Sequence, residues 1–318
     1  MRLSKGGHAG ARNTSMPKHT QPMREVMMPE DNNNNQNPEI IQPRIKKNKL
    51  IKKSNVFNDI VVNHQKRDGR FKNCLLPVPI WCLAERGMPN GLLRSALFGM
   101  VKRGTRARLN NVPLFTSRNT TLYFSGYELN QKDCDVFMTL LNLVQEQGTY
   151  RAECSLYGLR KMLFLDKGKK NTLALKMSIE RLHDSSIKMK SPNAYYCGHL
   201  VDSFAFDERK GTYVLRINPD IANLFHDGFA KLKMETRLHL KGDLSKFLHG
   251  LVLTHRAAID RPQLYKLETI HSLSRSKEKR RRMFKAKVAS GMEQLKNLGV
   301  VLKWSISKEE VLSFTRPR

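Results

Sequence analysis

Three residues of the segment LTHRAAIDRPQLY are of the types that cleave and rejoin DNA in a tyrosine recombinase: His255, Arg256 and Tyr265. In such a site a tyrosine hydroxyl attacks the phosphodiester while neighbouring groups activate it. The recombinase pattern is His-x-x-Arg, with the tyrosine tens of residues later. Here the histidine and the arginine are adjacent, and Tyr265 follows them too closely. The spacing therefore argues against this chemistry.

Other catalytic or metal-binding patterns are also incomplete. A histidine-ligated nicking enzyme needs two histidines separated by one apolar residue, which His239 and His249 do not provide. No G-x-x-x-x-G-K-[ST] loop occurs, so ATP-driven opening of DNA by this chain alone is not expected. We therefore expect no enzyme, no catalytic residue and no cofactor.

The five cysteines are widely spread, and no two stand at a C-x-x-C spacing. This pattern favours reduced thiols in a cytosolic protein over a metal site or a disulfide. The ten histidines do not cluster near them. We expect no bound metal. The cysteines are Cys74, Cys82, Cys134, Cys154 and Cys197.

The charge of the chain indicates a binding function. With 57 Lys and Arg against 28 Asp and Glu, the formal net charge is +29, and the pI is about 10.2. A protein that neutralises phosphates needs such a field, whereas an enzyme for a small neutral substrate does not. The sequence has no apolar stretch long enough to span a bilayer and no secretion signal. We expect a cytoplasmic protein that binds nucleic acid and no membrane.

The densest basic run is KEKRRRMFKAK, residues 277–287, with seven Lys or Arg in eleven positions. Alone it fits a nuclear signal, a disordered tail or the exposed start of a helix. The last reading is favoured because Phe284, Val288, Met292 and Leu295 recur at helical spacing as one apolar stripe. Lys279, Arg282 and Ala286 then face outward, as in a recognition helix that enters the major groove.

The candidate DNA contacts fall into two groups. Arg282 and Lys279 are predicted to read bases, since arginine pairs bidentately with guanine. On the first of two predicted DNA-facing helices, Lys176 and Met177 point outward, and SPNAYY is the predicted wing, which can reach phosphate or the minor groove. Tyr195 or Tyr196 either stacks on an unpaired base or packs within a hairpin. The predicted phosphate contacts are Lys169, Lys170, Lys277, Arg280, Arg281, Lys285 and Lys287.

The elements that position these residues occur in a repeated order. Residues 150–217 read as strand, helix, turn, helix and hairpin, which is the order of a winged helix. A helix after Asn90, a hairpin at 112–129 and a helix at 133–147 precede it. The predicted segments are YRAEC, SLYGLRKMLFL capped by Ser155, NTLALKMSIERLHD, SIKMKS, the turn PNAYYCG, HLVDSFAFD, the turn ERKG and TYVLRI.

The second half of the chain repeats this order. A helix capped by Asn218 is followed by a long helix at 233–257, which Gly242 and Asp243 interrupt. QLYKLETIHSL gives a short strand and helix, the basic helix ends at Gly299, and VVLKWSI and VLSFT form a hairpin. We predict an α+β fold of two tandem winged-helix domains, residues 76–217 and 218–318. Residues 1–75 are predicted to be disordered, and their basic block PRIKKNKLIKK is a solvated linker, a phosphate-binding arm or a nuclear signal.

Several stretches across residues 86–305 resemble plasmid replication initiators of the TrfA family. Within them the elements RSALF and KLET are the most specific. The stretches are MPNGLLRSALFGMVKRG, PLFTSRNTTLYFSGYEL, the segment 133–147, ERLHDSSIKMKS, HLVDSFAFDERKG, LTHR with YKLETIHSL, and EQLKNLGVVLKW.

The resemblance implies tandem winged-helix domains that bind direct repeats, called iterons, in double-stranded DNA at a plasmid origin. It further implies opening of adjacent AT-rich DNA, contact with the single strand, plasmid copy control and a monomer–dimer equilibrium. The implied partners are the host initiator, the replicative helicase and the sliding clamp. Residues 40–90 lack the Gln-anchored apolar–aromatic motif with which members can bind the clamp, so a direct clamp contact stays open.

A second function is compatible with the same fold. A sequence-specific transcriptional repressor or a partition-type DNA-binding protein can also use winged helices, since fold does not fix function. Two different winged helices in one chain suit an asymmetric, directly repeated site, whereas a two-fold dimer suits a palindrome. Direct repeats near the coding gene would therefore favour the initiator.

Overall fold

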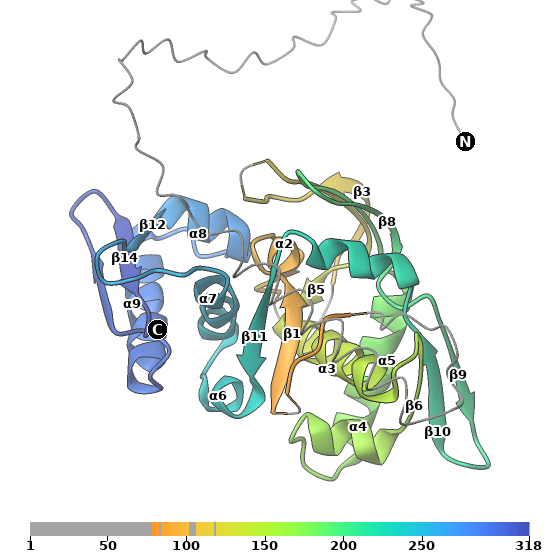
Figure 1. Cartoon of the computed structure of the whole chain (residues 1–318). Helices are drawn as coiled ribbons and strands as arrows, with labels where there is room; N and C mark the ends of the chain where they lie inside the picture. The colour runs from red at the N-terminus through yellow and green to blue at the C-terminus, as the bar shows by residue number, and fades with distance from the viewer. Residues whose placement is uncertain (1–77, 83, 102–105, 118, 318) are drawn as a thin grey trace, which may run out of the picture. The chain divides into compact units, whose positions relative to one another are not determined.

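The computed structural model describes residues 78–317 without 83, 102–105 and 118 (Figure 1). Two hydrophobic cores organise this part of the chain. The first core runs from Val78 to Met234 and the second from Leu240 to Phe314. The predicted disordered segment 1–75 and its basic block lie outside the described residues. No helix among the described residues is long and apolar enough to cross a membrane.

The first winged helix has the predicted strand and two helices, but its wing is the hairpin of residues 203–216 and not the predicted segment SPNAYY. Its three-stranded antiparallel sheet has the order β6-β10-β9, so the last two strands form the wing against the strand that precedes the helix-turn-helix. Helices α3 and α5 pack on each other, and α4 packs on α5. The elements are α3 (Gln131–Gln147), β6 (Arg151–Ser155), α4 (Leu156–Met162), α5 (Lys169–Asp184), β9 (Ser203–Asp207) and β10 (Thr212–Arg216).

The central helix α3 begins and ends where its sequence provides caps. Asn130 accepts hydrogen bonds from the backbone N–H groups of Lys132 and Asp133, and the Asp133 carboxylate accepts from the Asn130 backbone at 2.9 Å. This reciprocal capping box satisfies donors that the first turn leaves unpaired. Gly148 ends the helix with φ 63°, in the left-handed region that favours glycine.

An additional sheet interrupts the first winged helix between α5 and β9. Strands β7 (Ser186–Lys190) and β8 (Tyr195–His199) join β3 (Arg108–Pro113) and β4 (Thr121–Tyr127) in the order β3-β4-β7-β8. The predicted turn PNAYYCG is therefore wrong beyond Ala194. Tyr195 to Gly198 instead pair with β7, because alternate residues of this segment bury Tyr196 and expose its neighbours.

The predicted helix after Asn90 is reduced to one turn. Helix α2 (Asn90–Leu93) is preceded by Pro89, and the backbone N–H of Asn90 donates to the Gly228 carbonyl. Ser95 donates its hydroxyl to the Leu92 carbonyl and accepts from the Leu97 backbone, which replaces helical hydrogen bonds. The chain continues into β2 (Phe98–Gly99), which pairs in parallel with β5 (Leu129–Asn130).

Residues 219–234 belong to the first core, although the expected boundary placed them in the second domain. The 3₁₀ helix η1 (Pro219–Phe225) is capped by Asn218 as predicted. Strand β11 (Phe229–Lys233) pairs along β1 (Glu85–Pro89), which would otherwise have no partner. Ile221 and Leu232 join the first core for this reason. We propose a boundary between Met234 and Leu240.

The second winged helix repeats the order of the first without the inserted strands β7 and β8. Its sheet order, β12-β14-β13, corresponds to β6-β10-β9. Gly242, with φ 87°, separates α6 (Met234–His239) from α7, which confirms the predicted interruption. The elements are α7 (Asp243–Leu253), β12 (Gln263–Lys266), α8 (Leu267–Ser274), α9 (Arg281–Asn297), β13 (Lys303–Ile306) and β14 (Val311–Thr315).

Helix α9 is shorter at its start than the basic run suggests. It begins at Arg281, so Lys277 and Lys279 precede it, while the predicted apolar stripe from Phe284 to Leu295 is buried. At the other end, Gly299 has φ 70° and Val300 donates to the Leu295 carbonyl at 2.9 Å. This hydrogen bond closes the helix as a Schellman motif.

Buried ion pairs join the two winged helices. The Asp135 carboxylate on α3 accepts from Arg237 on α6 and from Lys246 Nζ on α7, the latter at 2.8 Å. The Arg237 side chain is only 1% exposed, and it also donates to Gln131 at 2.6 Å. Desolvation opposes the charge of Arg237, but the adjacent Asp135 carboxylate raises the arginine pKa overall.

Candidate nucleic-acid interface

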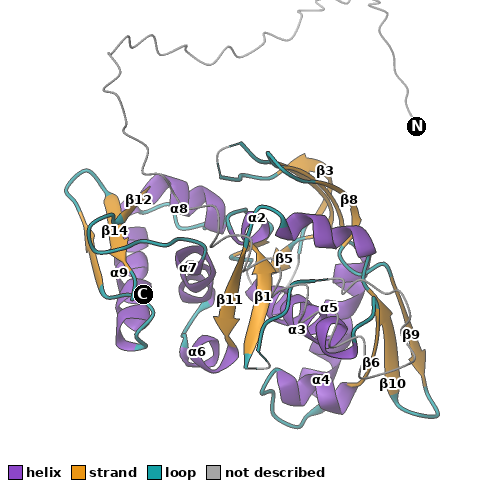
Figure 2. Cartoon of the chain, in the orientation of Figure 1, coloured by secondary structure: helices purple, strands orange, loops and turns teal. Residues whose placement is uncertain are grey.

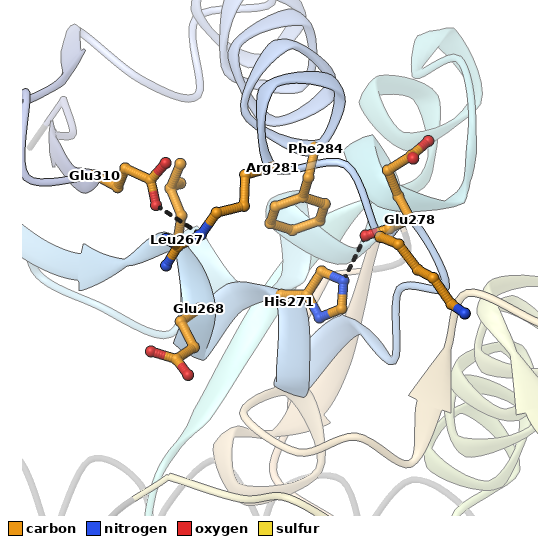
Figure 3. Close-up of a pocket in the computed structure, with 8 residues that line it drawn as sticks. Leu267, Glu268, His271, Glu278, Arg281, Phe284 and Glu310 are labelled. Atoms are coloured by element: carbon orange, nitrogen blue, oxygen red, sulfur yellow. Dashed lines mark hydrogen bonds and ion pairs between the residues drawn. The ribbon is translucent and has the colours of Figure 1, made fainter.

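The N-terminus of α9 meets the end of α8 and the turn of the wing. Figure 3 shows Arg281 and Phe284 from α9, His271 from α8 and Glu310 from the wing around one cavity of about 220 Å³. His271 contributes a ring nitrogen 2.9 Å from the Glu278 carbonyl oxygen, and its ring lies edge-on to Phe284. These contacts hold the segment before α9 against α8.

Glu278 is an acidic residue within the basic run, and it binds two of the predicted contact residues. Lys287 Nζ lies 2.7 Å from one carboxylate oxygen, and Arg280 Nε lies 3.3 Å from the other. Hydrogen bonds from Lys287 and then from Arg280 lower the pKa of Glu278 to about 2. The carboxylate therefore stays ionised and competes with DNA phosphate for these cations.

Two further cations are attached to the wing. Arg281 Nε lies 3.5 Å from a Glu310 carboxylate oxygen. Lys285 Nζ lies 3.4 Å from the Ser307 carbonyl oxygen, a contact near the limit of a hydrogen bond. Because Ser307 and Glu310 form the turn between β13 and β14, the helix and the wing share one charged surface.

Lys277, Lys279 and Arg282 are exposed, and among the described residues none of their three side chains has an ion pair or a hydrogen bond. Arg282 lies in the first turn of α9 and is exposed, in agreement with its predicted outward position. Lys279 does not lie on the outer helical face, because the helix starts after it. It lines the cavity instead. Ala286 is exposed on α9, as predicted, and so is Ser290 on the same helix. Arg282 is therefore the predicted base reader that is both helical and unpaired.

The first winged helix presents a different surface on α5. Lys169 and Lys170 are exposed at its N-terminus, where the first turn carries no acidic residue. Lys176 is half-buried, with Nζ 5.1 Å from the centre of the Phe206 ring on the wing strand β9. Leu173 is 59% exposed and Met177 46% exposed. The face combines cations with apolar side chains.

The two tyrosines of SPNAYY have opposite positions. Tyr196 is buried, its hydroxyl donates to the His199 carbonyl at 2.5 Å, and burial raises its pKa. Tyr195 is 61% exposed. Hairpin packing therefore describes Tyr196, and only Tyr195 is open to an unpaired base.

The recombinase-like residues form a structural contact. His255 Nε2 lies 2.8 Å from the Tyr265 hydroxyl, while Arg256 is exposed. Burial, with nearby Arg94 and Arg316, lowers the pKa of His255 to about 4. Burial raises the pKa of Tyr265, which is the opposite of an activated nucleophile. Within the described residues, no cluster of His, Cys, Asp or Glu could hold a metal ion.

The acidic partners Glu278 and Glu310 were not among the predicted site residues. Both stand in the sequence next to predicted contacts, Glu278 inside KEKRRR and Glu310 in the turn SKEE. A single Glu between cations is a usable signal of internal charge pairing. Which cation it binds depends on the start of α9 and on the wing turn, and neither was fixed by periodicity.

Residues 116–252 match the family model described as "Initiator Replication protein, WH1". The matched segment extends from just before β4 to within α7, and it covers less than half of the chain. It includes the whole of the first winged helix. This region is therefore similar to the WH1 domain of initiator replication proteins, the broad class that the sequence resemblance predicted.

Among solved structures, the chain is similar to domains 2 and 3 of RctB, with 11% identity and a TM-score of 0.48, over 72% of this chain and 98% of that chain. It is also similar to the Pi initiator protein in complex with iteron DNA, with 10% identity and a TM-score of 0.48, over 75% of this chain and 100% of that chain. No curated protein sequence matches it. Both scores are below 0.5, so the winged-helix assignment rests on the order of elements and on the family match.

Proposed function

We propose that this protein initiates plasmid replication by binding direct repeats at the plasmid origin. The observation that carries the proposal is the match of residues 116–252 to the WH1 domain of initiator replication proteins, followed in the same chain by a second winged helix. Two non-identical winged helices read a long asymmetric site, which suits a directly repeated sequence. The net charge of +29 supplies the attraction to phosphate.

In the second winged helix, α9 enters the major groove with its N-terminal end first. Arg282 reads a base, and Lys277 and Lys279 reach phosphates beside it. Arg280, Arg281 and Lys287 exchange their carboxylate partners for phosphates on binding. Lys285 of α9 lies beside the turn of the wing. In the first winged helix, Lys169, Lys170 and Lys176 make the corresponding contacts.

The finer parts of the proposal come from the resemblance to the TrfA family. They are opening of the AT-rich segment, contact with the resulting single strand, a monomer–dimer equilibrium and recruitment of the host initiator and replicative helicase. Direct contact with the sliding clamp has less support, because its motif was not found in residues 40–90. A cytoplasmic location follows from the proposed role.

The alternative is a transcriptional repressor or a partition-type DNA-binding protein. Selection of bound fragments from randomised duplex DNA at about 0.15 M salt separates these functions. An asymmetric motif longer than one helical turn, present as direct repeats beside the gene, supports the initiator. A palindrome moves the protein to the repressor class. Absence of any enriched motif would contradict both.

The salt dependence of binding tests the phosphate contacts. In an Arg280→Ala, Arg281→Ala variant, the slope of log K against log salt should decrease by about one unit per lost contact. The matched control replaces Lys241 and Lys296, which are exposed at the C-terminal end of α9 and were not predicted to contact phosphate. An unchanged slope in the arginine variant would remove these residues from the interface.

A further inference from the structure

The sheet β3-β4-β7-β8 has one buried and one open face. Leu122 and Phe124 of β4, and Ile187 and Met189 of β7, point into the first core. Tyr196 of β8 joins them. Because side chains alternate along a strand, the intervening residues form the opposite face. That face is solvent-exposed over most of the sheet.

On the open face, each of three tyrosines lies opposite a lysine or an arginine of the neighbouring strand. Tyr195 is opposite Lys190, Tyr123 is opposite Lys188, and Tyr127 is opposite Arg108. Directly opposite residues of antiparallel strands have Cβ atoms about 4.5–5.5 Å apart. Each aromatic ring on this face therefore has a positive charge beside it. Within the four strands there is no Asp or Glu.

The tyrosine rings are open to a ligand. Tyr195 is 61% exposed, Tyr123 42% and Tyr127 39%. Arg108 lies over the Tyr127 ring at 5.7 Å. For the side chains of Tyr123 and Tyr195, by contrast, the described part of the chain offers no hydrogen bond and no ring contact. Three exposed aromatic rings on one face of a sheet are more than a scattered apolar residue, and they indicate a binding surface.

The edge of this sheet adds polar groups. The register between β3 and β4 shifts between Leu109 and Val112, and Asn111 has φ 50°. The Asn111 backbone N–H donates to Ser125 Oγ at 2.8 Å. Both Asn110 and Asn111 are exposed at this bulge. Bulges often redirect side chains at binding sites, and an amide side chain can donate to and accept from a base edge.

We propose that the open face of the sheet β3-β4-β7-β8 binds single-stranded DNA. Unpaired bases stack on Tyr123 and Tyr195, while Lys188, Lys190 and Arg108 neutralise the adjoining phosphates. Stacking rings beside cations are the combination that binds single strands without sequence preference. In duplex DNA the faces of the bases are stacked inside the helix, so they cannot stack on these tyrosine rings. The inference rests on the proposed function for the source of the strand, the opened AT-rich segment.

The sheet is separate from the proposed duplex contacts of the second winged helix. In Figure 2 strands β3 and β8 lie at the upper right, whereas α9 and β14 lie at the far left. Helix α4 of the first winged helix lies at the opposite, lower side of the view. A single strand on the sheet would therefore leave α9 and its wing open to duplex DNA.

Binding of the full-length protein to a fluorescent 20-nucleotide oligothymidine tests the proposal. The variant Tyr123→Ala, Tyr195→Ala should bind it at least about fivefold more weakly for each ring removed. Tyr123→Phe, Tyr195→Phe should retain binding, because the stacking surface remains. The matched control is Tyr157→Ala, a 59% exposed tyrosine on α4. Thermal unfolding verifies that the variants fold.

Binding of the same variants to selected duplex DNA separates this inference from the proposed function. Loss on the single strand with duplex binding within twofold of the parent supports the sheet. Equal losses on both DNAs, or an unaffected single-strand affinity, overturn it. Photocrosslinking of a strand carrying 5-iododeoxyuridine should label peptides of β4 and β8; label confined to α9 also overturns it. If the tyrosine variant instead converts a dimer to a monomer without changing strand affinity, the face belongs to a second copy.

Discussion

The two winged helices have the same order of elements and expose different chemistry. Helix α5 presents Lys169 and Lys170 together with exposed Leu173 and Met177. Helix α9 presents four Arg or Lys in its first seven residues, and most of them are paired with Glu278, Glu310 or the wing backbone. One fold thus carries a mixed apolar and basic face in one copy and a charge-paired face in the other.

This difference suggests that α9 and α5 contact DNA through different kinds of interaction. Carboxylates hold the paired cations of α9 in place, and under the proposed function these cations exchange their carboxylate partners for phosphates. The apolar groups of α5 contribute contact area without directional bonds. The two units can differ in this way only if they act independently. The buried ion pairs of Asp135 with Arg237 and Lys246 join them, so this junction is tested first.

Removal of Arg237 should have the largest effect, because it connects the units. Arg237→Ala leaves the buried Asp135 carboxylate with Lys246 as its remaining ion-pair partner. Breaking a buried ion pair typically costs about 3–5 kcal/mol of unfolding free energy. Urea denaturation measures the loss. Asp135→Asn in the same background should recover part of it, since the uncompensated charge is then gone.

The matched control for the junction is Arg280→Ala. Arg280 also pairs with a carboxylate, but its side chain is 74% exposed. An exposed pair contributes little to stability, on the order of 0–1 kcal/mol. Similar losses in the two variants would show that the junction is not a cooperative element, and the two winged helices would then be independent units.

Acid should destabilise the second unit through the buried His249 and the partly buried His255. Burial lowers the pKa of His249 to about 3 and that of His255 to about 4. Both rings are therefore neutral in the folded chain at pH 5, whereas in the unfolded chain they bind protons below about 6.5. The unfolded state then binds more protons, and the unfolding free energy falls as pH falls. Each histidine should cost about 2 kcal/mol between pH 7 and pH 5.

Urea denaturation at pH 7 and pH 5 measures this loss. His255→Gln should reduce the pH dependence, because a group that titrates differently in the two states has been removed. His239→Gln, at an exposed position, is the matched control. If His255→Gln keeps the full pH dependence of the parent, the loss arises elsewhere in the chain.

Much of the fold could be predicted from the local sequence, and the predictions that were wrong failed for physical reasons. The stripe from Phe284 to Leu295, the Ser155 cap and the Gly242 interruption depend on neighbouring residues, and all are present. The pairing of β11 with β1 joins residues far apart in the chain. No periodicity of either segment encodes its partner, so the first core extended beyond the expected boundary.

The candidate site was less predictable than the fold. Periodicity correctly placed Arg282 on the exposed face of α9, but it could not show that Lys279 precedes the helix. The start of the helix is set by contacts of Glu278 with His271 and Lys287, which come from outside the local pattern. Likewise, the turn predicted at PNAYYCG concealed the strand that exposes Tyr195.

The DNA contacts of α9 and α5 should differ in kind. Arg282→Ala should weaken binding to the selected site by about 1–3 kcal/mol and relax specificity at one base pair, because a bidentate contact to guanine is lost. Lys176→Ala should weaken binding to selected and random duplex alike, since a phosphate contact carries no sequence information. Fluorescence anisotropy on both DNAs distinguishes the two. Equal losses for Arg282→Ala on selected and random duplex would contradict base reading by α9.

The smallest effect sharpens the comparison at the starts of α4 and α8. Ser155 Oγ accepts from the Gly158 backbone at 2.9 Å, whereas Lys266 at the matching position provides no side-chain cap. Ser155→Ala should cost about 1 kcal/mol of unfolding free energy, and Lys266→Ser should gain about 0.5 kcal/mol, because the serine can bond a free N–H of the first turn. Denaturation midpoints measure both. If Lys266→Ser instead lowers the unfolding free energy, the strand pairing of β12, and not a cap, determines where α8 begins. Equivalent helices in the two units would then start for different physical reasons.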